Sequence, residues 1–229
     1  MKFFGIPVRF DVSALLLIYI LALNGFSIAS AETPAVRVVS ALLLPATLIF
    51  SILFHERAHI LAASRYGIGC RGITLLLFGG FATLESMGKR PREMFVIAIA
   101  GPLSSLLLAG IGLALSLAGQ VFFGNALPPL VSNLLSIFTF LNMMLALFNI
   151  LPVYPLDGGR MLHSALWDRC KDMEIARRQS IKVARIVIVV LFGLLLIGVV
   201  AGKVSVFSFV WFVLLAALLW QIQNRELKL

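Results

Sequence analysis

Two histidines and a glutamate in this sequence have the spacing of a metal-dependent hydrolase. His55, Glu56 and His59 form the pattern H-E-x-x-H. Positions i and i+4 of a helix lie on one face, so both imidazoles could bind a single metal ion. Glu56 lies next to the first histidine, where it could take a proton from a water molecule that the metal activates. The pattern therefore predicts a zinc (Zn2+) site with His55 and His59 as ligands and Glu56 as the general base.

A third ligand must come from elsewhere, because a catalytic zinc ion usually has three protein ligands and one open position. Asp157 is the best candidate, since it is an acid in the irregular segment 152–160, which reads PVYPLDGGR. Gly158 and Gly159 permit backbone geometry that a regular helix forbids. The alternative is that Asp157 caps a helix that continues over 158–169.

The segments that must hold these side chains are too apolar for a soluble domain. Hydrophobic residues make up 61% of the 229 residues and charged residues 13%, whereas soluble domains carry about 25% charged residues. We therefore predict an all-α polytopic membrane protein that forms a single domain over 1–229. About six transmembrane helices are expected, at 12–31, 36–62, 93–118, 131–151, 181–201 and 204–222.

The first apolar segment also has features of a signal peptide. Ala29-Ser30-Ala31 matches a cleavage site. The apolar run is longer than the hydrophobic region of most signal peptides, so we expect an uncleaved first span.

The distribution of basic residues predicts the orientation. Lysines and arginines gather in alternate loops, and the opposite loops contain only Arg37 and Lys203. By the positive-inside rule, both termini of this multi-pass protein of the cell membrane are cytoplasmic. The same bias accounts for the net charge of +9, so the expected partner is the lipid bilayer and no nucleic acid. Taking Arg65 as the cytoplasmic surface, the metal lies roughly 9–15 Å inside, and the active site opens toward the cytoplasm.

Ionisable groups are costly in a membrane and usually mark function. Glu56 is the only acid in the interior of a predicted span, since Glu93 stands at the very start of its span. Outside the spans, two β-prone runs flank Gly79-Gly80 and predict a small membrane-associated β-hairpin over 71–86. Open strand edges cannot face lipid, so this hairpin should pack against protein or lie at the interface.

Three further patterns accompany H-E-x-x-H over nearly the whole chain. They are Phe78-Gly79-Gly80, Ala100-Gly101-Pro102 and the run N-x-x-P-x-x-P-L-D-G-G from Asn149 to Gly159. Together these patterns resemble the site-2 protease family of intramembrane zinc metalloproteases, in particular its six-span branch. The resemblance implies His55, His59 and Asp157 as zinc ligands and Glu56 as the base.

The same resemblance implies that Asn149 holds the substrate carbonyl or its oxyanion, although a hydrogen bond at the helix terminus is an equal alternative. It implies that the hairpin lies near a transmembrane protein substrate, such as a membrane-tethered transcription regulator or an anti-sigma factor.

The chain departs from that branch in two respects. We find neither a nucleotide-sensing CBS domain nor a PDZ domain, and Arg57 stands where the family prefers an apolar residue. Arg57 could snorkel toward the cytoplasm, pair with an acid or contact substrate. His163, the remaining histidine, is expected to be an ordinary polar residue on a surface helix.

These features predict hydrolysis of a peptide bond within or near a transmembrane helix, as in regulated intramembrane proteolysis. One alternative is a metal transporter, which needs an exit route on the other side of the membrane. A second is an inactive scaffold that binds no metal. A third is a protease of prenylated proteins, which is expected to use a distal glutamate as ligand, and no second glutamate lies in the interior of a predicted span.

Overall fold

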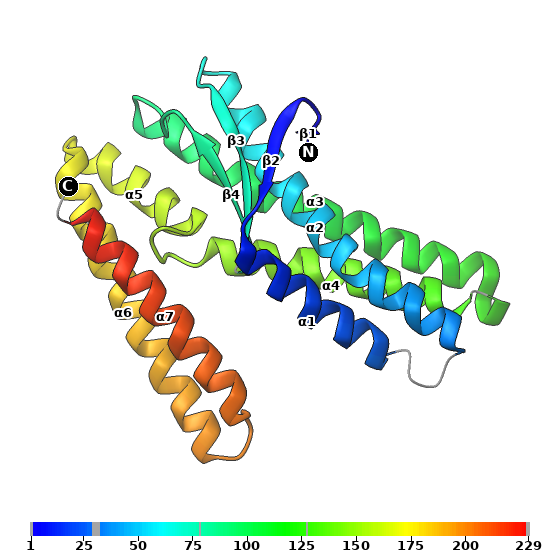
Figure 1. Cartoon of the computed structure of the whole chain (residues 1–229). Coiled ribbons are helices and arrows are strands. Elements are labelled where there is room, and N and C mark those ends of the chain that lie inside the picture. The colour runs from blue at the N-terminus through cyan, green and yellow to red at the C-terminus, as the bar shows by residue number, and fades with distance from the viewer. Residues whose placement is uncertain (1, 29–32, 78, 127, 228–229) are drawn as a thin grey trace. The chain divides into compact units, whose positions relative to one another are not determined.

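The computed structural model describes residues 2–28, 33–77, 79–126 and 128–227. This part of the chain is mostly helical and includes a small sheet (Figure 1). The helices are α1 (Val12–Ile28), α2 (Pro34–Ser64), α3 (Pro91–Phe123), α4 (Pro129–Ile150), α5 (Asp157–Cys170), α6 (Met173–Val200) and α7 (Val206–Glu226). A 3-10 turn, η1 (Gly124–Ala126), follows α3, and the strands are β1 (Lys2–Phe3), β2 (Ile6–Phe10), β3 (Cys70–Leu76) and β4 (Gly79–Leu84).

Each of the six predicted spans coincides with a described helix, apart from one or two residues at the ends of three of them. The first, 12–31, is α1 as far as Ile28, and the Ala29-Ser30-Ala31 pattern lies outside the described residues. Among the described helices, α2, α3, α4 and α6 are long and apolar enough to cross a membrane. With 17 residues, α1 is shorter than the ~20 residues of a typical span. Four candidate spans are thus present, and the number six stays a prediction.

The chain divides into two compact units. The first comprises residues 1–88 and 100–148, and the second comprises 89–99 and 149–229. Helices α3 and α4 each contribute residues to both. That the two units work as a single domain is a prediction from the sequence.

The predicted β-hairpin exists, but its turn does not lie at Gly79-Gly80. Both glycines belong to β4, which pairs antiparallel with β3 so that Gly80 lies opposite Leu75. The turn therefore precedes them, and Phe78 of the predicted pattern lies outside the described residues. A Cβ atom at Gly80 would lie 2.5 Å from Ile52 of α2, so close packing against the helix accounts for a glycine within the strand.

Two N-terminal strands that the sequence did not predict enlarge the sheet. β1 pairs antiparallel with β2, and β2 pairs parallel with β3, with Val8 opposite Ile73. The strand order is β1-β2-β3-β4, so β1 and β4 are the outer strands of the described sheet. Phe4 and Gly5 form the tight turn between β1 and β2 with positive φ angles of 46° and 84°.

The sheet packs on α2 and so fixes the helix that carries H-E-x-x-H. Ile52 and Ile60 of α2 flank the motif and are buried together with Ile73 and Leu75 of β3. Because strands and helix share this core, the orientation of α2 is tied to the sheet.

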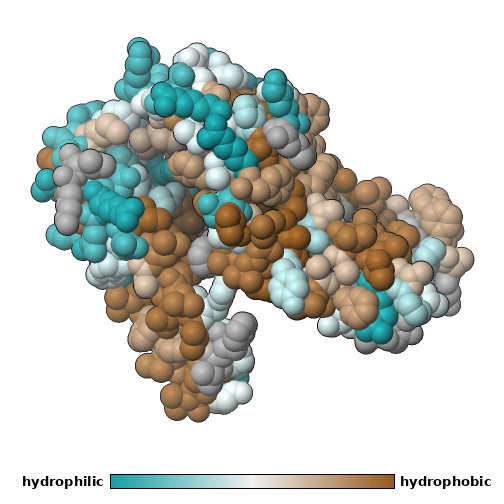
Figure 2. Space-filling view, in the orientation of Figure 1, coloured by the Kyte–Doolittle hydropathy of each residue, from teal (hydrophilic) through white to brown (hydrophobic). Residues whose placement is uncertain are grey.

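In the second unit, the break predicted over 152–160 covers only 151–156, because the helix α5 already begins at Asp157. Val153 is 2% exposed and packs with Ile188 of α6 and Leu219 of α7. Figure 1 shows α6 and α7 side by side, and Figure 2 shows hydrophobic residues along most of this pair. The break is therefore held by buried apolar contacts with both helices.

Candidate metal centre

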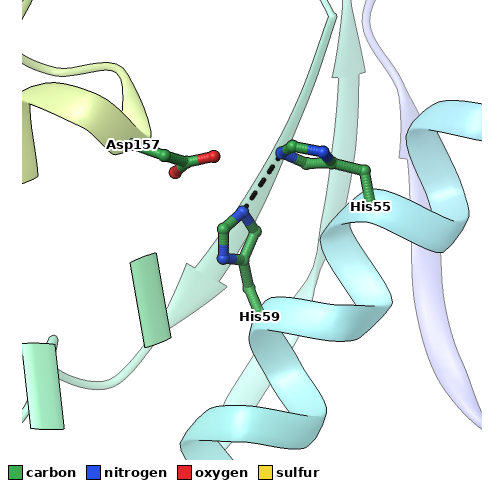
Figure 3. A group of neighbouring side chains, drawn as sticks. All are labelled: His55, His59 and Asp157. Carbon is green, nitrogen blue, oxygen red and sulfur yellow. Dashed lines mark hydrogen bonds between the residues drawn. The ribbon is translucent and has the colours of Figure 1, made fainter. Parts of the chain in front are cut away.

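His55 and His59 lie on successive turns of α2 and are 3% and 5% exposed. Their Nε2 atoms are 3.2 Å apart and face each other (Figure 3). Two nitrogens that each lie ~2.05 Å from a zinc ion at the tetrahedral angle are separated by about 3.3 Å. The two imidazoles therefore already have the spacing of two ligands of one zinc ion.

Gly101 of α3 leaves room for the two imidazoles. A Cβ atom at this position would lie 2.5 Å from Nε2 of His55 and would also collide with the ring of His59. Any side chain here would occupy the space next to the two Nε2 nitrogens. The glycine of the Ala100-Gly101-Pro102 pattern thus has a direct physical reason, which is clearance for the two imidazoles.

Ser105, which lies on α3 like Gly101, contacts His55. Its Oγ atom lies 2.9 Å from Nδ1 of His55, and Ser105 is fully buried. When Nδ1 donates a hydrogen bond to Oγ of Ser105, Nε2 of His55 carries no proton and can act as a ligand to a metal ion. Sequence reasoning missed Ser105, although it lies four residues after Gly101 and so on the same face of α3.

Glu56 is 8% exposed and points from α2 to β4. Its Oε2 atom accepts a hydrogen bond of 2.8 Å from the backbone N–H of Ala82. A Cβ atom at Gly80 would lie 3.0 Å from Cγ of Glu56, so the second glycine of Gly79-Gly80 also makes room for this side chain. The edge strand therefore orients the predicted base.

Asp157 is the first residue of α5 and is 6% exposed. The N-cap of this helix is Leu156, so Asp157 is not the capping residue that the alternative interpretation required. Among the described His, Cys, Asp and Glu side chains, His55, His59 and Asp157 are the set that could hold a metal ion, with one ligand atom each (Figure 3). Two imidazoles and a carboxylate suit zinc chemically.

The segment before Asp157 is held by a buried amide of α7. Gln223 is fully buried, and its Nε2 atom donates a hydrogen bond of 2.7 Å to the backbone carbonyl of Tyr154. Burial raises the pKa of the Tyr154 hydroxyl. Asn149 is half-buried in the last turn of α4, directly before this segment. Gln223 could not be identified from the sequence, because it lies 69 residues after its partner Tyr154.

His163 and Arg57 differ from expectation. His163 is 3% exposed and its Nε2 atom lies 3.1 Å from the carbonyl oxygen of Met173, so its predicted place on a surface is wrong. The physical reason is that α5 packs on α6, and burial lowers the pKa of His163.

The guanidinium of Arg57 lies 4.2 Å from the ring centroid of Phe4, a contact that none of its three predicted roles included.

Comparisons of the sequence with a family model and with individual proteins indicate the same family. The sequence matches the model of peptidase family M50 over residues 44–127 and 120–198. Rip3 of Mycobacterium tuberculosis is 40% identical over 157 residues, which cover 68% of this chain and 39% of Rip3. The zinc metalloprotease MJ0392 of Methanocaldococcus jannaschii is 32% identical over 212 residues, which cover 91% of this chain and 57% of that protein. The chain thus spans less than two thirds of the length of these relatives.

The fold agrees with the sequence match. The solved structure of the site-2 protease from Methanocaldococcus jannaschii superposes with a TM-score of 0.64 and 25% sequence identity, covering 100% of this chain and 94% of that one. With its apolar helices, the protein is a multi-pass membrane protein. The chain therefore belongs to peptidase family M50, the family of the site-2 protease and of zinc metalloproteases such as MJ0392.

Proposed function

We propose that this protein is an intramembrane zinc metalloprotease that hydrolyses a peptide bond within or near the transmembrane helix of a membrane protein substrate. The observation that carries the proposal is the pair of buried imidazoles on α2. Their Nε2 atoms are 3.2 Å apart, and Glu56 follows directly after the first of them. Within a family of zinc metalloproteases, this arrangement is suited to peptide hydrolysis.

His55, His59 and Asp157 are the proposed zinc ligands. Their donor set supports the proposal, as do the low exposure of all three side chains and the clearance at Gly101. When bound, zinc supplies Lewis-acid activation of a water molecule and of the scissile carbonyl. A set of three protein ligands leaves the fourth position of a tetrahedral ion open for this chemistry.

Glu56 is the proposed general base. One carboxylate oxygen is engaged by the N–H of Ala82, and the other can accept a proton from the attacking water. The C–N bond then breaks as Glu56 returns that proton to the leaving amine, so the residue ends each cycle in its starting state.

Asn149 and β4 are the proposed substrate-binding elements. The side-chain amide of Asn149 can donate a hydrogen bond to the oxygen of the scissile carbonyl, where negative charge develops. A substrate helix must unwind before hydrolysis, because its carbonyls are otherwise hydrogen-bonded within the helix. β4 is an outer strand beside Glu56, so its main-chain groups can replace some of those lost hydrogen bonds.

The proposed substrate is a single-span regulatory protein, such as a membrane-tethered transcription regulator or an anti-sigma factor. Basic residues at both ends of the chain support cytoplasmic termini, and the active site would open to the same side.

The test is the Glu56→Gln variant with a fluorescent transmembrane substrate in liposomes. The variant should bind zinc with unchanged stoichiometry and lose cleavage by a factor of about 100 or more, because the base contributes about 10²–10⁴ in rate. Glu85→Gln, the same change at an exposed residue, is the matched control and should cleave normally. Undiminished cleavage by Glu56→Gln would refute the assignment, and zinc flux across the liposome without cleavage would favour the transporter.

A further inference from the structure

A basic hollow lies at the end of the α6–α7 pair where α6 begins and α7 ends. It has a volume of about 340 Å³. Three basic side chains line it, Arg178, Lys182 and Arg185, and the rest of the wall is Gln179 together with the apolar side chains of Ile175, Ile181 and Leu227. Figure 2 shows hydrophilic surface gathered at this end of the pair and hydrophobic surface beyond it. The hollow thus combines positive charge with an apolar wall.

Both helices change from apolar to polar at the level of this hollow. Arg185 is the last charged residue of α6 before the uncharged run 186–200, and Trp220 is the last residue of α7 before its polar end. The guanidinium of Arg185 lies 4.7 Å from the ring centroid of Trp220 and donates a hydrogen bond of 2.7 Å to Oδ1 of Asn224. Arginine and tryptophan together mark the boundary between hydrocarbon and headgroups. The hollow therefore lies at headgroup depth.

The donors in the hollow are only partly used within the protein. Arg178 donates from Nε to Glu174 at 2.9 Å, and its exposed side chain has further donors on Nη1 and Nη2. Nε of Arg185 is buried and has no hydrogen-bond partner among the described residues. Lys182 is exposed. An arginine fork matches the oxygens of a phosphate group, and a lysine adds a point charge.

We propose that this hollow binds the phosphate headgroup of an anionic phospholipid. The phosphate would lie among Arg178, Lys182 and Arg185, and the glycerol and first acyl carbons would contact Ile181 and Leu227. Basic pockets between membrane helices on the cytoplasmic side are suited to anionic headgroups. The proposal concerns binding and does not depend on proteolysis.

The experiment measures binding of phosphatidylglycerol to the full chain in a zwitterionic detergent by native mass spectrometry, with phosphatidylcholine as the neutral lipid. Wild-type protein should retain one phosphatidylglycerol in preference to phosphatidylcholine. Lys182→Gln and Arg185→Gln should each weaken that binding about fivefold, the effect of one basic side chain near an anionic headgroup. Arg185→Lys keeps the charge and should lose less than Arg185→Gln.

Arg169→Gln is the matched control, because Arg169 is an exposed basic residue of the same unit outside the hollow. It should bind phosphatidylglycerol as the wild type does. Equal weakening in Arg169→Gln and Lys182→Gln would overturn the proposal, since it would show attraction by net charge alone. Displacement of the lipid by millimolar inorganic phosphate would overturn it too, because the ligand would then be a soluble anion. Lys182 is exposed, so its substitution tests binding without threatening the fold.

Discussion

Removing the hydroxyl of Ser105 should weaken zinc binding without touching any proposed ligand. In the Ser105→Ala variant, Nδ1 of His55 loses the oxygen that lies 2.9 Å away. Ser105 is fully buried and His55 is 3% exposed, so bulk water cannot easily replace the lost partner. Zinc binding through Nε2 obliges Nδ1 to carry the proton, whereas the metal-free imidazole can place its proton on either nitrogen.

The magnitude follows from that difference between the two states. A buried donor without a partner costs about 1–3 kcal/mol. The cost falls mainly on the metal-bound state, where the tautomer is fixed, so it is subtracted from the free energy of zinc binding. We therefore expect zinc affinity to fall about 10- to 100-fold, the usual range for loss of a residue that orients a ligating histidine.

Zinc affinity is measured by competition with a fluorescent chelator on purified protein in detergent. Ser104→Ala is the matched control, because the hydroxyl of Ser104 bonds to the carbonyl of Gly101 within α3 and not to a histidine. Cleavage by Ser105→Ala should recover at saturating zinc, since Glu56 is unchanged. Wild-type affinity in Ser105→Ala, or an equal loss in Ser104→Ala, would show that Ser105 does not orient His55.

Three other changes have predictable outcomes. Gly101→Ala should abolish zinc binding because its methyl group would overlap both imidazoles, whereas Gly110→Ala, on the same helix with no atom within 4 Å of an added Cβ, should bind zinc normally in the same chelator assay. Gln223→Met leaves the backbone carbonyl of Tyr154 without its hydrogen bond and should lower the free energy of unfolding, measured by thermal denaturation, by about 1 kcal/mol. The same change at the exposed Gln221 should not lower it. Because burial lowers the pKa of His163 below 6.5, the unfolded chain takes up a proton first, so stability is highest above about pH 6.5 and falls as the pH drops through the folded-state value. When the free energy of unfolding is measured by chemical denaturation between about pH 5 and pH 8, the part of its pH dependence that comes from His163 should vanish in His163→Gln.

Local patterns in the sequence were enough to predict the long apolar helices and to identify the side chains that the structure brings together at the candidate site. Apolar runs of span length need no tertiary information, and the six predicted segments coincide with described helices. The i, i+4 spacing of His55 and His59 is likewise local and places both on one face of α2. Asp157 was identified because an acid in a Pro- and Gly-rich break is unusual next to an apolar segment.

Features that depend on contacts between distant segments could not be predicted in the same way. The strands β1 and β2 are short, and β2 is stabilised by pairing with β3 more than sixty residues later. Gly79-Gly80 resembles a turn by local preference, but both glycines lie in β4, where Gly80 packs against α2. His163 is polar and was expected on a surface, yet α6 covers it. In each case a tertiary contact outweighed the local preference.

Arg57 is best understood from the contacts of its neighbour. Glu56 binds the backbone of β4, and Arg57 covers the ring of Phe4 in the turn between β1 and β2. Successive residues of a helix point about 100° apart, so these two side chains leave α2 in different directions. Because β1 and β4 are the outer strands, the side chains of Glu56 and Arg57 contact the sheet near its two opposite edges.

The aromatic surroundings explain how a charge is tolerated at position 57. The rings of Phe3 and Phe54 pack edge-on against that of Phe4, with centroid distances of 4.8 and 6.4 Å. A guanidinium over such a ring gains about 0.5–2 kcal/mol, so Arg57 is stabilised by the face of Phe4 and does not require an acid. By holding the N-terminal turn on α2, Arg57 helps to fix the sheet whose last strand orients Glu56. Its place inside H-E-x-x-H is therefore explained by support of the sheet whose strand β4 binds Glu56, the proposed base.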